Sequence, residues 1–301
     1  MSQTIPSLVP VSRKLATPDT ARQLVLNVAC PNHAGIVHAL TSVLVAHDCD
    51  IAQHQQFDDH VHDMVFTRTA FGSETADVEV LRQEIASVAE RFDMTWQLHD
   101  ARRPMRALVM VSKFSHCLND LLYRRALGSL DADIVQVVSN HEDLRSMAEG
   151  AGVPFTHVPI SKATKPEAEA RLKQIVTDND VDLVILARYM QVLSDDLCTW
   201  LDGRAINIHH SFLPSFKGAR PYHQAYARGV KQIGATAHYV TPDLDEGPII
   251  EQDVIRVDHS LSPDDLVAAG RDVESLVLSR AVQWHAQHRV LRYGSRTVVF
   301  K

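Results

Sequence analysis

The stretch Val-Asp-Leu-Val-Ile-Leu-Ala, residues 181–187, is almost continuously apolar. A run of this kind predicts a strand that is buried on both faces, as at the centre of a parallel sheet. Strands and amphipathic helices alternate around it, with strands predicted at 106–112, 133–138 and 205–208 and helices at 117–128, 142–151 and 166–178. Strict alternation predicts a doubly wound, mostly parallel α/β sheet, and such sheets bind ligands at the carboxyl ends of their strands.

The chain downstream of this region adds three further elements. A strand is predicted at 233–240, and a short strand pair at 289–293 and 296–300. Between them, Ser262 and Pro263 form a helix start signal, so a long helix is expected to run to about residue 286.

The chain upstream follows a different pattern. Strands at 23–30, 51–58, 62–71 and 93–98, with helices from residues 36 and 78, give the order βαββαβ, a compact α+β unit. Residues 99–104 are polar and end in a proline, as in a linker. The predicted organisation is a flexible tail at 1–22, an α+β domain at 23–99 and an α/β domain at 105–301.

Composition narrows the classes of function. The 301 residues include 37 acidic and 30 basic side chains, and a net charge of −7 argues against nonspecific nucleic-acid binding. No apolar run approaches the roughly 20 residues that span a bilayer, so no membrane partner is expected. The four cysteines are scattered without a CxxC pair, which indicates reduced thiols and a cytoplasmic location: Cys30, Cys49, Cys117 and Cys198.

Three polar side chains are predicted at the ends of neighbouring strands. Asn207 and His209 are two residues apart on one strand, so they leave the same face roughly 7 Å apart. Asn207 can donate to a developing oxyanion and His209 can move a proton near neutral pH. A carboxylate from the loop after the strand 233–240, which holds Asp243, Asp245 and Glu246, can orient the imidazole. The set predicts acyl-type transfer through a tetrahedral intermediate without a covalent enzyme adduct; the alternative is that these are capping or surface residues.

Metal binding is not predicted. His60 and His62 lie close together, but no third and fourth ligand with zinc-like spacing accompanies them. We expect both histidines to face solvent, and we expect Cys117 to be a packing residue.

Three segments together resemble the formyltransferase family, which uses 10-formyltetrahydrofolate. They are Asn-Ile-His-His-Ser-Phe-Leu-Pro (207–214), Gly-Ala-Thr-Ala-His-Tyr-Val (234–240) and Asp-Leu-Asp-Glu-Gly-Pro-Ile (243–249). The resemblance covers residues 105 to about 290. It implies no permanently bound cofactor, with 10-formyltetrahydrofolate as the substrate. It also implies that Asn207, His209 and Asp245 are catalytic and that the following residues bind the substrate: Arg188, Tyr189, Met190, Gln191, Val192, Leu193, His238, Thr241 and Lys113.

The acceptor of the formyl group distinguishes the branches of this family. Residues 111–122 contain no glycine, unlike the phosphate-binding turn of glycinamide ribonucleotide transformylases, and Arg188 stands where those enzymes usually have glycine. The sequence is similar to the deformylase branch, which implies hydrolysis to tetrahydrofolate and formate in one-carbon and purine metabolism. Two alternatives stay open: formyl transfer to an amine such as glycinamide ribonucleotide, and a sensing protein without catalysis.

The α+β domain resembles an ACT domain. Cys-Pro-Asn-His-Ala-Gly-Ile-Val (30–37) stands at its first strand–helix turn. The resemblance implies a homo-oligomer and an amino-acid effector bound near Asn32, His33, Gly35 and Ile36. A purely structural dimerisation module is the alternative.

Overall fold

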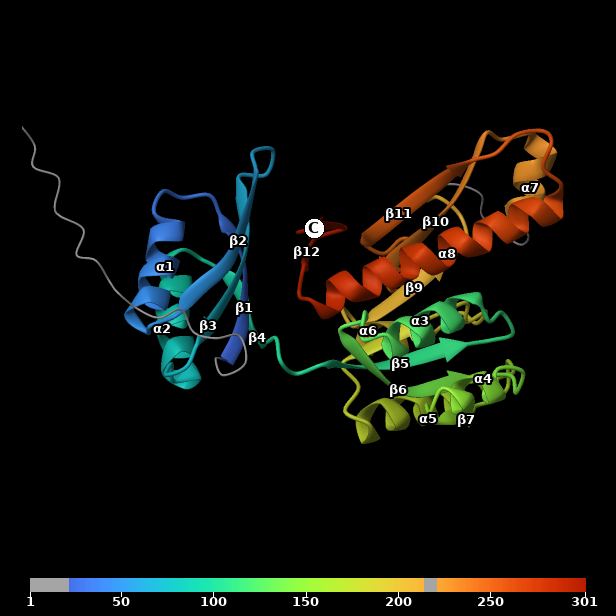
Figure 1. The fold of residues 1–301 in the computed structure, drawn as a ribbon, viewed down its shortest axis with the longest axis horizontal. Coiled ribbons are helices and arrows are strands. Elements are labelled where there is room, and N and C mark those ends of the chain that lie inside the picture. Colours follow the sequence, from blue (N-terminus) through green and yellow to red (C-terminus); the bar gives the residue numbers. More distant parts are fainter. Residues whose placement is uncertain (1–21, 214–220) are drawn as a thin grey trace, which may run out of the picture. The chain divides into compact units, whose positions relative to one another are not determined.

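The computed structural model describes residues 22–213 and 221–301, and the chain divides into two compact units between Arg102 and Arg103. The predicted tail at 1–22 lies outside the described residues, apart from Arg22, which is the first residue of a strand. Each unit is described by itself below (Figure 1).

The first unit has the predicted βαββαβ order. Its elements are β1 (Arg22–Pro31), α1 (Ile36–Ala46), β2 (Asp50–Asp59), β3 (Met64–Ser73), α2 (Val78–Arg91) and β4 (Thr95–Asp100). The strands form one antiparallel sheet in the order β2-β3-β1-β4. Alternate residues of β1, such as Leu24, Leu26 and Val28, pack with Leu40 and Ile85 of the two helices, so both helices cover the same face of the sheet. This α+β arrangement is consistent with an ACT-like fold.

The second unit is built on a seven-stranded sheet in the order β11-β10-β9-β8-β5-β6-β7. Five strands run parallel: β5 (Met105–Val111), β6 (Ala132–Ser139), β7 (Phe155–His157), β8 (Leu183–Leu186) and β9 (Ala205–His209). The predicted apolar run contains β8, which lies between β5 and β9 and is fully buried. The last two strands, β10 (Gln232–Tyr239) and β11 (Ile249–Arg256), are paired antiparallel. The prediction of a mostly parallel α/β sheet is confirmed.

Helices cover both faces of this sheet (Figure 1). One face packs against α3 (His116–Ala126), α4 (Arg145–Gly150) and α8 (Pro263–Ala286), and the other against α5 (Lys165–Asp178) and α6 (Asp195–Trp200). The remaining helix, α7 (Pro221–Arg228), packs on α8. Burial on both faces explains why the central strand β8 is apolar at every position.

The predicted start of the long helix is confirmed. Ser262 and Asp265 form a capping box at the start of α8, with Pro263 in the first turn. The chain then ends in the predicted strand pair, β12 (Val290–Tyr293) and β13 (Arg296–Val299).

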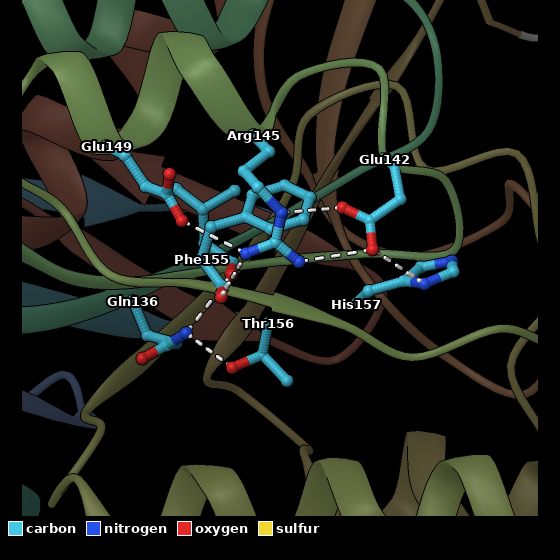
Figure 2. Close-up of polar contacts among 8 residues, drawn as sticks. Gln136, Glu142, Arg145, Glu149, Phe155, Thr156 and His157 are labelled. Atoms are coloured by element: carbon cyan, nitrogen blue, oxygen red, sulfur yellow. Dashed lines mark hydrogen bonds and ion pairs between the residues drawn. The ribbon is translucent and has the colours of Figure 1, made fainter.

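Side chains of neighbouring elements hold the short edge strand β7 (Figure 2). The Arg145 guanidinium lies 4.7 Å from the ring centre of Phe155 and donates to Glu142 Oε2 at 2.6 Å. Gln136 of β6 donates to Thr156 Oγ1 at 2.9 Å. These contacts accompany the parallel pairing of β6 with β7, which has only three residues.

Among residues 22–213 and 221–301, no helix combines the length and the apolar character needed to cross a membrane. All four cysteines are buried and free.

Candidate active site

The structure brings together the three polar residues that the sequence placed at strand ends. Asn207 and His209 lie on β9, and Asp245 lies in the loop that joins β10 to β11. His209 Nδ1 is 3.2 Å from Asp245 Oδ2. His238 of β10 pairs with Asn207 across the antiparallel ladder, and its Nε2 is 3.2 Å from Asn207 Nδ2. An amide, two imidazoles and a carboxylate therefore converge on one point.

The hydrogen bond to Asp245 fixes the tautomer of His209. An ionised carboxylate only accepts, so Nδ1 carries the proton that His209 shares with Asp245. In the neutral ring, Nε2 then carries the lone pair. This nitrogen is buried and has no hydrogen-bond partner in the part of the chain that the structure describes. His209 can therefore act as a base through Nε2.

A backbone carbonyl fixes the orientation of His238. Its Nδ1 lies 2.9 Å from the carbonyl oxygen of Tyr239, which can only accept, so Nδ1 is the donor. Nε2 of the neutral ring then accepts from the Asn207 amide. The second hydrogen of that amide remains available for an oxyanion.

Asp245 is held in its ionised form. Burial alone would raise the pKa of its carboxyl, but the hydrogen bond with His209 outweighs burial. The pKa of Asp245 lies well below its ordinary value, so the carboxylate is charged at neutral pH.

A cavity of about 660 Å³ opens beside these residues. Its volume lies in the range of small-molecule sites. The segment 188–193 forms one wall, the loop residues Thr241, Pro242 and Leu244 form another, and Asn207, His209, His238 and Asp245 also face it. Every substrate-binding residue proposed from the sequence lines this cavity except Lys113, which is exposed and not among the lining residues, although its neighbour Phe114 is.

The buried side chains of Ser112 and Asn140 support the wall formed by 188–193. Ser112, just after β5, accepts a hydrogen bond from the Met190 backbone N–H at 3.0 Å and donates to Asn140 Oδ1 at 2.7 Å. Arg188 turns the chain into this wall with a φ of 66°, which is uncommon for a residue with a side chain. The wall is therefore anchored to the ends of β5 and β6.

The other end of the cavity is polar and was not predicted. Its centre is Glu274 of α8, whose side chain is 1% exposed. The Glu274 carboxylate accepts hydrogen bonds from His116 Nε2 at 2.7 Å and Tyr222 OH at 2.6 Å, and Arg188 Nε lies 3.3 Å away. Burial would raise the pKa of Glu274, but His116, Arg188 and Tyr222 outweigh burial and lower it. In the sequence, Glu274 looks like an ordinary solvent-facing helix residue, and no local signal distinguishes it.

One group of possible metal ligands overlaps this cluster. Ligand atoms of His116, Cys117 and Glu274 all lie within 4.8 Å of one another. Both carboxylate oxygens of Glu274 already accept hydrogen bonds, and the Arg188 cation stands beside them. Burial raises the pKa of the Cys117 thiol, which disfavours the thiolate that a metal requires. These groups are better suited to one another than to a cation.

His210 lies between the two parts of the site. Its ring centre is 5.2 Å from that of His209 and 6.3 Å from that of Tyr222. Burial, and then the charge of Arg188, lowers the pKa of His210 to about 4. The ring is therefore neutral at physiological pH.

The lowered pKa of His210 predicts a pH-dependent stability. Between the unfolded pKa of about 6.5 and the folded value, only the unfolded chain takes up the proton. The stabilisation is present above pH of about 6.5 and is lost as the pH falls towards 4. Between about pH 8 and about pH 5, we expect the free energy of unfolding to fall by about 2 kcal/mol more in the native protein than in His210→Gln, as measured by urea denaturation. Equal losses in the two proteins would contradict the burial of a neutral ring.

The effector residues proposed from the sequence lie in the turn between β1 and α1. Asn32, His33 and Gly35 are exposed, and Gly35 has a φ of 93°. Ile36 differs, because its side chain is 3% exposed and packs in the core of the first unit. Only the backbone of Ile36 remains available to an effector. His62, one of the two histidines considered above as metal ligands, has its ring hydrogen-bonded to Asp59 at 2.9 Å.

Comparison with known proteins finds similarity over most of the chain. Residues 105–282 match the formyl transferase family. A formyltetrahydrofolate deformylase of Corynebacterium sp. (strain P-1) is 54% identical over 279 residues, covering 92% of this chain and 98% of that protein. The crystal structure of formyltetrahydrofolate deformylase from Burkholderia mallei ATCC 23344 has a TM-score of 0.88 and 52% identity, covering 93% of this chain and 100% of that chain.

A transformylase structure matches a smaller part. Glycinamide ribonucleotide transformylase 1 from Symbiobacterium toebii has a TM-score of 0.61 and 30% identity, covering 65% of this chain and 94% of that chain. The similarity to deformylases thus extends over both units, whereas the transformylase matches about two thirds of the chain.

Proposed function

The chain belongs to the formyltetrahydrofolate deformylase family, and from this premise we propose that Asn207, His209 and Asp245 carry out the reaction. The enzyme is a hydrolase that converts 10-formyltetrahydrofolate to tetrahydrofolate and formate. Formyl transfer to glycinamide ribonucleotide is not favoured, because the relatives that match more than 90% of the chain are deformylases. The observation that carries the site assignment is the His209–Asp245 pair beside the Asn207 amide in one cavity.

The apolar part of the cavity binds the pterin. Tyr189, Met190, Val192 and Leu193 supply apolar surface there, and Thr241 is on the facing loop. The formyl carbon then faces Asn207 and His209. The flat pterin ring then lies between the two walls, and the reacting formyl amide lies at the polar side of the cavity.

Proton movements follow from the tautomer of His209. Nε2 removes a proton from a water molecule as the oxygen attacks the formyl carbon, and Asp245 stabilises the imidazolium that forms. The Asn207 amide donates to the carbonyl oxygen as it becomes an oxyanion. The tetrahedral intermediate collapses when N10 takes the proton from His209, which breaks the C–N bond and releases formate. No oxidation state changes, so the reaction itself requires no redox cofactor, and the folate takes part as a substrate.

Removal of the Asn207 amide tests the oxyanion assignment. We expect Asn207→Ala to lower kcat by about 10²–10³-fold, because one preorganised donor in such a site contributes about 3–4 kcal/mol to the transition state. Formate release from 10-formyltetrahydrofolate without any added acceptor is the measurement. Asn179→Ala is the matched control, because Asn179 follows the last turn of α5 and is not among the residues that line the cavity. Near-native turnover of Asn207→Ala would refute the role.

The first unit is proposed as a regulatory or oligomerisation domain that spans residues 23–99. The support is its ACT-like topology and the exposed turn formed by Asn32, His33 and Gly35. An amino-acid effector would bind there, and the protein would be a homo-oligomer in the cytoplasm, in keeping with four free thiols. Calorimetry with amino acids tests effector binding, and sedimentation of the full chain tests homo-oligomerisation.

A further inference from the structure

The acceptor must reach the formyl carbon from the polar end of the cavity. This follows from the proposed function, in which the pterin occupies the apolar walls. His210 stands next to His209, and Tyr222 stands next to His210, so the cluster around Glu274 lies beyond the catalytic residues on that side. Whatever attacks the carbon must share this space with the cluster.

Arg188 occupies this end of the cavity under tight constraint. Its side chain is 9% exposed, lines the cavity and forms an ion pair with Glu274. The guanidinium carbon lies 5.3 Å from the ring centre of Phe114, a cation–π distance. Glu274 is itself fixed by His116 and Tyr222. The position of Arg188 is thus set by α3, α7 and α8 together.

One donor of Arg188, its Nε, is not used by the described protein. The buried Nε makes no hydrogen bond to any described residue, because its contact with Glu274 is an ion pair without hydrogen-bond geometry. A guanidinium offers five donors and no acceptor. A water molecule can accept from a guanidinium N–H and still has two hydrogens to donate. A primary amine has only one lone pair, which it must keep for the attack, and its protonated form is repelled by the charge.

We propose that Arg188, positioned by Glu274, is a specificity-determining residue that reserves the acceptor position for water. Its bulk excludes substituted nucleophiles, and its charge disfavours amines. Without it, an amine nitrogen attacks the formyl carbon, the bond from carbon to N10 breaks, N10 takes up a proton, and the amine loses one to give a formamide.

Product partitioning tests this proposal. The full-length enzyme is incubated with 10-formyltetrahydrofolate and glycinamide at about pH 8.5, above the usual α-amino pKa, and formate and N-formylglycinamide are both quantified. We expect formate to be the main product of the native enzyme, with a measurable trace of the formamide as the reference. Arg188→Gly suits the left-handed backbone and should raise the ratio of formamide to formate at least about tenfold. Arg188→Met, which keeps most of the bulk, separates the effect of size from that of charge.

Controls make each outcome decisive. Arg271→Met removes another cation near Phe114 and should leave the ratio unchanged, because Arg271 is exposed and is not the cation paired with Glu274. If Arg188→Gly does not fold, the double variant Arg188→Gly/Glu274→Gln takes its place in the test. The second substitution removes the carboxylate that the loss of Arg188 leaves uncompensated. An unchanged product ratio in a folded variant would overturn the proposal. So would a folded variant that makes neither product, because Arg188 would then serve hydrolysis itself. Absence of formate from the native enzyme would instead refute the proposed function.

Discussion

Replacement of His209 by alanine is expected to lower kcat by about 10³-fold. The reason is that Nε2 both takes the proton of the attacking water and returns it to N10, and positioned acid–base groups contribute about 10²–10⁴-fold. KM should change little, because the pterin contacts lie on the walls formed by Tyr189 to Leu193 and by Thr241. Steady-state kinetics of formate release is the measurement.

Two comparisons make this result specific to His209. His259→Ala removes an exposed histidine outside the cavity and should keep native kinetics. Asp245→Asn keeps the shape of the side chain but removes the charge that stabilises the imidazolium, so it should also lose most turnover. If His209→Ala retained a tenth or more of the native kcat, Nε2 would not be the group that moves the proton.

The sequence could predict that Asn207, His209 and a carboxylate from the 241–247 loop meet, because each stands at or after a strand end, and the family resemblance selected Asp245 as that carboxylate. Asn207 and His209 alternate on one strand, and Asp245 follows the neighbouring strand in a doubly wound fold. In such a fold, side chains at adjacent strand ends must lie close together. The segment 188–193, which follows the buried strand β8, was assigned to the substrate site by the resemblance to the formyltransferase family.

The polar cluster could not be predicted, since it depends on contacts between distant elements. Glu274, His116 and Tyr222 come from three different helices, and each alone is compatible with an exposed helix position. Their burial is a property of how α3, α7 and α8 meet the sheet. Strand β11 was missed for a related reason, because Glu251 and Gln252 interrupt its apolar residues. Gln252 compensates by donating to Thr236 of β10 and to the Leu213 carbonyl.

Replacement of Gly247 by alanine, which adds one methyl group outside the active site, is expected to displace residues of that site. A Cβ atom at this position would lie 1.8 Å from the carbonyl oxygen of Tyr239. Neither atom sits on a rotatable side chain, so no change of rotamer relieves the overlap. The loop must instead move by about 1 Å or more to reach an allowed contact, and Asp245 lies in that loop two residues earlier. The Tyr239 carbonyl also fixes the ring of His238.

Gly247→Ala should therefore lower kcat by about 10²-fold, because a misplacement of about 1 Å is enough for such a loss. It should also lower the free energy of unfolding by about 1–3 kcal/mol, since the displaced loop strains the hydrogen bond from the Tyr239 N–H to the Pro248 carbonyl. Gly150→Ala is the matched control, because a Cβ there meets no atom within 4 Å. Kinetics and urea denaturation of the two variants measure both effects. Native kinetics in Gly247→Ala would show that the loop can shift without moving Asp245 away from His209, and the positioning of the imidazole would then have to come from elsewhere.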